Sequence, residues 1–200
     1  MRKYYCLIFI VFVCLSCSND QVKTSTKLNL NLKTDADHTA FLEKILEEDQ
    51  KVRDWKVEDS IVAKHGRDSK EHIAYFETMR EKDRNNLDKL NVYFEEYGYP
   101  SKERYGNQAA FAPAIVIHHN GLSVRENYFK ILYEAYLNED IEDSILSMYL
   151  GRTYRMKYRD EHTMENPYTS ESQINSLIQE LGYVQQKKEV KHKIEAKSKS

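Results

Sequence analysis

The sequence predicts an all-α fold, a compact bundle of about six helices with a central buried helix. Only six Gly and three Pro occur in 200 residues, so residues that break helices are rare. The long stretches between them are rich in Glu, Lys, Leu and Ala, and their apolar residues recur near the 3.6-residue period of an α-helix. One alternating stretch, residues 27–32, has the period of a β-strand, but a single short stretch is a weak signal.

The helical pattern falls into six segments. Asp35 or Asp37 can cap the first, and Gly98 with Pro100 ends the second. Pro113 lies inside the third and should kink it. The expected helices are 38–57, 69–97, 107–120, 123–138, 141–158, and a last one that follows Thr169-Ser170 and ends at Gly182.

Three of these segments carry further signals. The segment 107–120 is apolar on nearly every side, so it should be the central, buried helix. The next helix opens at Ser123, and Glu126 three residues later completes the pattern of a capping box. Gly182 suits the position just after a helix, where the left-handed conformation is common.

The N-terminus has the parts of a bacterial secretory signal. Arg2 and Lys3 give a positive start, an apolar run covers residues 4–15, and Ser16 is a small residue before a potential cleavage point. The run is shorter than the roughly 20 apolar residues that a membrane-spanning helix needs. We therefore expect export and cleavage rather than a transmembrane anchor.

Cys17, directly after this signal, is the expected site of lipid attachment. Leu15-Ser16-Cys17 resembles the lipobox of bacterial lipoproteins, in which the Cys receives a diacylglyceryl group and becomes the new N-terminus. The lipobox usually has Leu three residues before that Cys, and this chain has Cys14 there, so an ordinary signal peptide with an incidental Cys17 is the alternative. Cys6 and Cys14 leave with the signal, so the mature domain has no thiol for a disulfide.

These signals divide the chain into four parts. We expect a lipoprotein signal peptide at 1–16, a lipidated tether at 17–36, a helical domain at 37–183 and a basic, flexible tail at 184–200. Without Arg2 and Lys3, the 30 basic residues fall to 28 against 32 acidic ones, a net charge of about −4. This balance gives no footprint for DNA or RNA, and we expect no nucleic-acid partner.

The anchor sets the expected location and partners. We expect a protein attached through acyl chains to a membrane of the bacterial cell envelope, with the outer membrane favoured. The domain displayed there would bind an envelope protein, a peptide or a glycan. An envelope hydrolase is the alternative, and no cofactor is expected.

Helical phases place an ionisable residue on the apolar face of four predicted helices. Advancing by 100° per residue puts Asp49, Asp83, His119 and Arg152 on faces that ought to be buried. An isolated buried charge is costly, so these groups must meet partners. We predict that Asp49 and Asp83 meet Arg152 and His119, with Arg53 one turn beyond Asp49. The candidate cluster is Asp49, Arg53, Asp83, His118, His119 and Arg152.

Two interpretations of this cluster stay open. It is either a satisfied polar core that fixes the register of the helices, or a pocket in which a His polarised by a carboxylate acts as a base or grips a polar ligand. A metal site is not expected, because adjacent His118 and His119 diverge by 100° on a helix and no H-E-x-x-H or paired C-x-x-C occurs. No G-x-S-x-G motif or free Cys supports nucleophilic catalysis.

The same residues resemble a family of bacterial domains of unknown function. Its members carry D-Q-x-x-R, then D-x-x-N, G-W-P, Q-H-x-D, D-R and Y-G-T-Q. The matching stretches here are Asp49 to Arg53, Asp83 to Asn86, Gly98 to Pro100, Ile117 to Asn120, and Gly151-Arg152, within residues 41–183. The chain departs from the pattern at His118, Gly121 and Gly151 and has no Y-G-T-Q, which implies that any activity of the family is altered or lost in this member.

Overall fold

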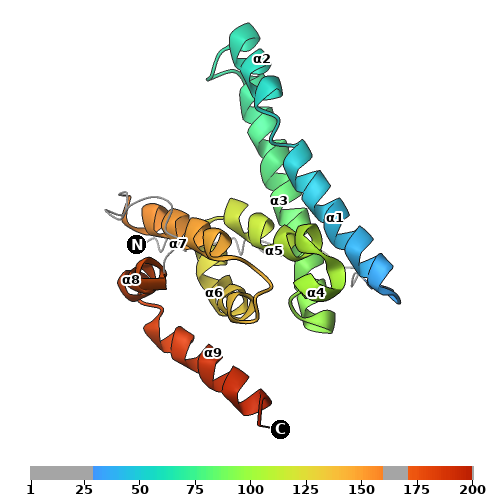
Figure 1. Ribbon diagram of the computed structural model, residues 1–200. Coiled ribbons are helices and arrows are strands. Elements are labelled where there is room, and N and C mark those ends of the chain that lie inside the picture. The colour runs from blue at the N-terminus through green and yellow to red at the C-terminus, as the bar shows by residue number, and fades with distance from the viewer. Residues whose placement is uncertain (1–28, 160–170, 200) are drawn as a thin grey trace, which may run out of the picture.

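The computed structural model describes residues 29–159 and 171–199, which fold into helices with no β-strand among them (Figure 1). This confirms the all-α prediction. The helices are α1 (Asp35–Lys51), α2 (Trp55–His65), α3 (Lys70–Tyr97), α4 (Lys102–Tyr105), α5 (Asn107–His119), α6 (Leu122–Leu137), α7 (Asp143–Tyr158), α8 (Glu171–Leu181) and α9 (Val184–Lys197).

The first predicted helix, 38–57, is two helices joined by a short turn. Thr34, rather than Asp35 or Asp37, caps α1, because its Oγ1 accepts the N–H of Asp37 at 3.2 Å and Asp37 Oδ2 accepts the N–H of Thr34 at 2.9 Å. At the other end α1 stops at Lys51. Asp54 then starts α2 as its N-cap and accepts the N–H of Lys56 at 2.9 Å.

The predicted capping box at the start of α6 is wrong. The helix already begins at Leu122 with Gly121 in the cap position, so Ser123 lies inside the first turn and makes no cap hydrogen bond. The prediction for Gly182 is confirmed, since its φ of 81° ends α8 in a conformation that favours glycine.

The C-terminal segment was expected to be flexible, and it forms helix α9 instead. Val190 is buried and Ile194 packs beside it against the core, because residues four apart lie on one side of a helix. Lys193 and Lys197 reach Glu134 of α6 at 2.6 and 3.2 Å. The many lysines of this segment conceal a narrow apolar stripe.

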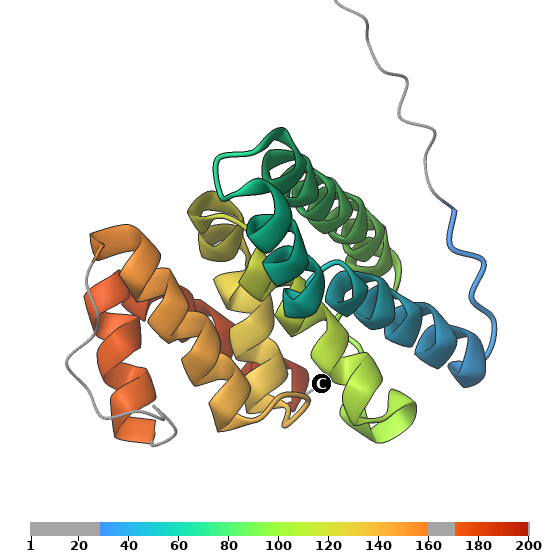
Figure 2. The same ribbon diagram turned by 90° about the horizontal axis from the view of Figure 1, so that it is seen from above.

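Helix α5 is the central element, as predicted, and packs against α1, α3, α4, α6 and α7. Figure 2 shows α1 and α3 on one side of α5 and α7 with α8 on the other. Each side has its own apolar cluster. Ala112 and Val116 of α5 belong to the cluster with α1 and α3, whereas Ala114 and Ile117 belong to the cluster with α6, α7 and α8. The polar C-terminal end of α5 therefore lies between two apolar cores.

Two segments in the N-terminal part of the described chain differ in how they pack against the rest of the domain. The hairpin of α2 and the first part of α3 projects from the body, and no residue of α2 is buried (Figure 1). Leu30, before α1, is buried and its carbonyl accepts the hydroxyl of Tyr97 at 2.7 Å, so the domain includes residues assigned to the tether.

Residues 29–32 form no strand, and the signal peptide and Cys17 lie outside the described residues. Within 29–159 and 171–199, no helix has the length and apolar character to cross a bilayer.

Candidate functional site

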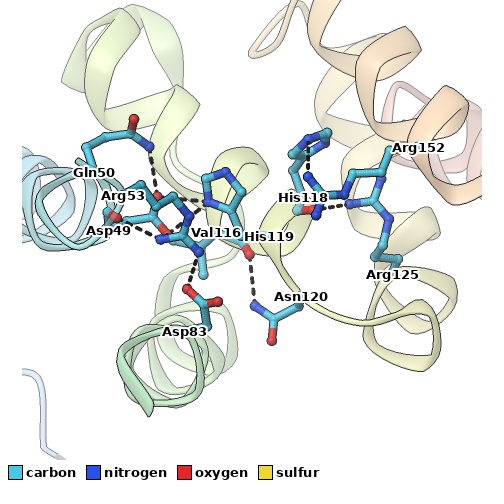
Figure 3. Close-up of polar contacts among 10 residues, drawn as sticks. All are labelled: Asp49, Gln50, Arg53, Asp83, Val116, His118, His119, Asn120, Arg125 and Arg152. Atoms are coloured by element: carbon cyan, nitrogen blue, oxygen red, sulfur yellow. Dashed lines mark hydrogen bonds and ion pairs between the residues drawn. The ribbon is translucent and has the colours of Figure 1, made fainter. Parts of the chain in front are cut away.

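The last turn of α5 aims its two histidines in opposite directions. The rings of His118 and His119 lie 5.5 Å apart between centroids and are inclined by 72°. His119 faces Asp49 and Arg53, while His118 faces Arg152 and Arg125 (Figure 3). The six predicted residues are thus brought together as two adjoining networks, which share the end of one helix.

Asp49 organises the network around His119. Its side chain is fully buried, and its oxygens lie 2.9 and 3.2 Å from His119 Nδ1. Gln50 Nε2 donates to the same carboxylate at 2.8 Å, and Arg53 Nη1 lies 3.1 Å from it. Because an ionised carboxylate only accepts, the ring proton is on Nδ1. In the neutral ring with its proton on Nδ1, Nε2 of His119 carries the lone pair, and it makes no hydrogen bond to a described residue.

Arg53 links the two aspartates. Besides its contact with the Asp49 carboxylate, its Nη1 donates to the backbone carbonyl of Asp49 at 2.7 Å, and its Nη2 pairs with Asp83 Oδ1. The predicted pairing of Asp83 with Arg152 or His119 is therefore wrong. Because the turn between α1 and α2 directs Arg53 across to α3, Asp83 pairs with Arg53.

The network around His118 contains no carboxylate among the described residues. Arg152 Nη1 lies 3.4 Å from Nε2 of His118, which accepts because a guanidinium only donates. Burial, followed by the positive charges of Arg125 and Arg152, lowers the pKa of His118 to about 3. His118 is therefore neutral at physiological pH, and its buried Nδ1 has no partner in the described part of the chain.

Arg125 of α6 is a site residue that the sequence interpretation missed. Its side chain is fully buried. Nε donates to Thr153 Oγ1 at 2.9 Å, and the two Nη atoms donate to the backbone carbonyls of His118 and Tyr149. The phase test identifies it, because Arg125 lies four residues before the buried Phe129. The S-x-x-E pattern of residues 123–126 indicates a helix start instead, and a residue in the first turn is usually exposed.

A pocket of about 290 Å³ opens over the His119 network. Tyr75, Met79 and Asp83 line it from α3, and their spacing of four residues gives one row along that helix. Trp55, the only tryptophan of the chain, stands at its wall with 66% of its surface exposed. The lining residues are Arg53, Trp55, Glu58, Tyr75, Met79, Asp83, His119 and Arg152.

Arg152 is the least satisfied charge in this pocket. Of the five N–H donors of its guanidinium, only the one to His118 has an acceptor in the described ranges, and that contact is long at 3.4 Å. No described carboxylate lies within 4.0 Å of it. Burial, then the charges of Arg155 and Arg53, lower its pKa, and the more distant carboxylate of Asp83 only partly opposes them. The two networks at the end of α5 together form a polar layer between the two apolar cores. Around Arg152 this layer has positive charges but no directly contacting carboxylate among the described residues.

Other hollows are less suited to a polar ligand. A groove of about 490 Å³ runs beside α9, but the three lysines that line it are already paired, Lys193 and Lys197 with Glu134 and Lys130 with Glu189. A smaller hollow of about 230 Å³ near the start of α5 is mainly apolar and includes Phe111 and Ile145. Among the described residues no group of three His, Cys, Asp or Glu is arranged to hold a metal ion.

Comparison with known proteins gives no relative from which a function could be transferred. No protein-family model matches the chain, and no curated protein or solved structure is significantly similar to it. The resemblance to the bacterial family of unknown function stays a prediction. The geometry of the pocket therefore carries the functional argument.

Proposed function

We propose that this protein is a lipid-anchored binding protein of the bacterial envelope whose pocket captures a small anionic ligand. The observation that carries this proposal is the guanidinium of Arg152, which lines the pocket without a described carboxylate partner. Partial burial costs this cation part of its hydration, and a partner that restores the lost interactions stabilises it. An anion that enters the pocket would do so and would accept the unused donors.

The charges around the pocket support this assignment. The lining residues include two cations, Arg53 and Arg152, and two carboxylates, Asp83 and Glu58. Asp83 pairs with Arg53, and Glu58 contacts His72. Arg152 is therefore the lining cation without a carboxylate partner among the described residues. A bound carboxylate or phosphate could form bidentate hydrogen bonds with Arg152, the geometry that a guanidinium favours. The pocket volume lies near the lower end of the roughly 300–1,000 Å³ that is usual for small-molecule sites, so the ligand is small.

Trp55 offers a direct test. As the only tryptophan, and at the pocket wall, it should report a saturable fluorescence change when inorganic phosphate is added at constant ionic strength. Arg152→Gln removes the unpaired cation and should weaken binding by about tenfold or more, since a hydrogen bond to a charged group is worth about 1.5–3 kcal/mol. Arg84→Gln makes the same charge change at an exposed position of α3 and should not alter binding.

The contrary outcome is equally clear. If the fluorescence of Trp55 does not change with phosphate, acetate or sulfate, or changes equally in the wild-type protein and in Arg152→Gln, the pocket is not an anion site. The polar layer would then be structural only.

A second candidate function, hydrolysis, is favoured by one observation. Asp49 fixes the proton of His119 on Nδ1 and leaves the lone pair of Nε2 as the free nitrogen of a pocket residue, which is the arrangement of a general base. Nε2 would take a proton from water as the water attacks an ester carbonyl, and would return that proton to the departing alkoxide. No Ser or Cys lines the pocket, so water would be the nucleophile.

The hydrolase is tested with 4-nitrophenyl hydrogen succinate, an ester that carries its own carboxylate for Arg152. Release of nitrophenolate should be faster with the wild-type protein than with His119→Gln, and His192→Gln, an exposed histidine on α9, should behave as wild type. Equal rates with and without His119 would leave binding as the function.

The envelope anchor has its own test. Cys17→Ser should remove lipid attachment, so the protein should leave the detergent phase and the membrane fraction. Unchanged partitioning of this variant would overturn the lipoprotein assignment without affecting the pocket.

A further inference from the structure

The pocket wall combines three kinds of group that one ligand class would satisfy together. It has a cation in need of a partner, Arg152, acceptors with unused capacity on Glu58, Asp83 and His119, and a solvent-exposed aromatic ring, Trp55. We propose that the ligand is an acidic sugar, a single pyranose ring bearing a carboxylate, such as a hexuronic acid. This inference rests on the proposed anion-binding function and names its ligand class.

The unused acceptors select against simple anions. Asp83 contacts Arg53 through Oδ1, and Glu58 contacts His72 through Oε1 at 3.3 Å, while the second oxygen of each carboxylate has no partner among the described residues. Carboxylates repel an anion that brings no protons, but they accept hydrogen bonds from hydroxyl groups. Nε2 of His119 is a further acceptor. The ligand must therefore carry one negative charge and several O–H donors.

The same two contacts separate a sugar from an amino acid. A zwitterion would place its ammonium group against Asp83 or Glu58, but the guanidinium of Arg53 already faces Asp83, and the ring of His72 occupies Oε1 of Glu58. What remains on each carboxylate is the hydrogen-bond capacity of its second oxygen. Neutral hydroxyl donors use that capacity without requiring a full negative charge in return.

Trp55 supplies the surface for the ring. It is the first residue of α2, and 66% of its surface is exposed, although large aromatic side chains are usually well buried. Lys56 Nζ lies 5.6 Å from the centroid of the indole, over one face. The C–H face of a pyranose would lie against the opposite face, and burying this aromatic surface would add binding energy. The pocket volume of about 290 Å³ suits one sugar ring.

The test uses the full-length protein in detergent solution and isothermal calorimetry with four probes. These are methyl glucuronide, methyl glucoside, propionate and phenylalanine. Methyl glucuronide should bind about tenfold or more tightly than each of the others, a difference of about 1.4 kcal/mol. Saturation-transfer NMR should show the strongest transfer to the ring protons on one face of the sugar.

Two variants separate the parts of the ligand. Trp55→Ala should weaken binding of the glucuronide by about fivefold or more and leave propionate within about twofold, because only the ring contacts the indole. Arg152→Gln should weaken both. Tyr158→Ala, another exposed aromatic residue, is the matched control and should change neither.

The outcomes distinguish this inference from the function on which it rests. Propionate binding as tightly as glucuronide, in an Arg152-dependent manner, overturns the sugar and keeps the anion site. Tighter binding of phenylalanine overturns the sugar in favour of an amino acid. No binding of glucuronide, propionate or inorganic phosphate overturns both proposals, whereas binding of phosphate alone overturns the sugar and keeps the anion site.

Discussion

Arg53 and Arg125 lie on opposite sides of the last turn of α5, and the protein stabilises them in opposite ways (Figure 3). Arg53 is partly exposed and meets two carboxylates, Asp49 and Asp83. Arg125 is fully buried and donates to a hydroxyl and two backbone carbonyls, with its guanidinium 4.9 Å from the centroid of the Tyr149 ring and no carboxylate partner among the described residues. On the α1–α3 side the cation meets carboxylates, whereas on the α6–α7 side it is solvated by dipoles and an aromatic ring.

This difference explains the electrostatics of the whole layer. Burial is the main reason that the pKa of Arg125 falls to about 10, and the positive charge of Arg152 lowers it further. The same excess of positive charge helps to keep His118 neutral. Arg152 stands between the two sides and, among the described residues, has neither a carboxylate within 4.0 Å nor a full set of hydrogen-bond acceptors. In the proposed function a bound anion supplies both.

The largest effect on stability is expected on the α6–α7 side, where neutral dipoles hold Arg125. Arg125→Leu would leave the carbonyls of His118 and Tyr149 and the hydroxyl of Thr153 buried without their donor, and should lower the free energy of unfolding by about 3–5 kcal/mol. Urea unfolding monitored by circular dichroism measures it. A loss below about 1 kcal/mol would mean that Arg125 reaches solvent and that the two sides do not differ.

The next effect is a dependence on pH that belongs to His118. Its pKa is about 3 in the folded protein and about 6.5 when unfolded, so above pH 6.5 the ring is neutral in both states. Below that pH the unfolded chain takes up the proton first, and stability falls by up to about 1.4 kcal/mol per pH unit until pH 3. At pH 5 the loss should be about 2 kcal/mol relative to pH 7.

His118→Gln isolates this contribution because glutamine does not titrate. The difference in unfolding free energy between pH 7 and pH 5 should shrink by the same ~2 kcal/mol in that variant. His192→Gln, an exposed control, should keep the wild-type dependence. Identical pH profiles for wild type and His118→Gln would show that His118 is protonated in the folded state and that the α6–α7 side is not short of negative charge.

The smallest effect tests whether Asp83 pairs with Arg53 or with Arg152. A double-mutant cycle between Asp83→Leu and Arg53→Met should give a coupling energy of about 1–2 kcal/mol, between the values for exposed and fully buried ion pairs. The cycle between Asp83→Leu and Arg152→Met should give less than about 0.5 kcal/mol, since these two make no direct contact. The reverse ranking would place Asp83 on Arg152 and fill the site proposed for the ligand.

Periodicity alone predicted much of this site. Asp49, Asp83, His119 and Arg152 each fall on a buried face, and all four lie around the end of α5 as their helical phases require. A phase gives the side of a helix, but it gives no distance and no partner. The partner of Asp83 depends on the turn at 52–54, which ends α1 early and swings Arg53 towards α3.

The features that the sequence did not predict have local physical reasons. Arg125 sits on the row of Phe129, but the S-x-x-E pattern around it indicated a helix start. The apolar pair Val190 and Ile194 lies among six lysines, so the composition of residues 184–200 favours a flexible tail although the segment forms α9. Trp55 joins the pocket only because α2 begins at that residue, after the turn that the periodicity of 38–57 concealed.

The most direct test of the central claim follows the arginine side chains themselves. In ¹H–¹⁵N spectra of the Nε–Hε groups, addition of methyl glucuronide or phosphate should shift the signal of Arg152 in a saturable manner. The signal of Arg125, which lies outside the pocket lining and whose Nε–H already donates to Thr153, should stay nearly still. A change in chemical shift at Arg152 no larger than that at the exposed Arg84 would show that the guanidinium of Arg152 binds no anion. That result would contradict the assignment of this pocket as a binding site.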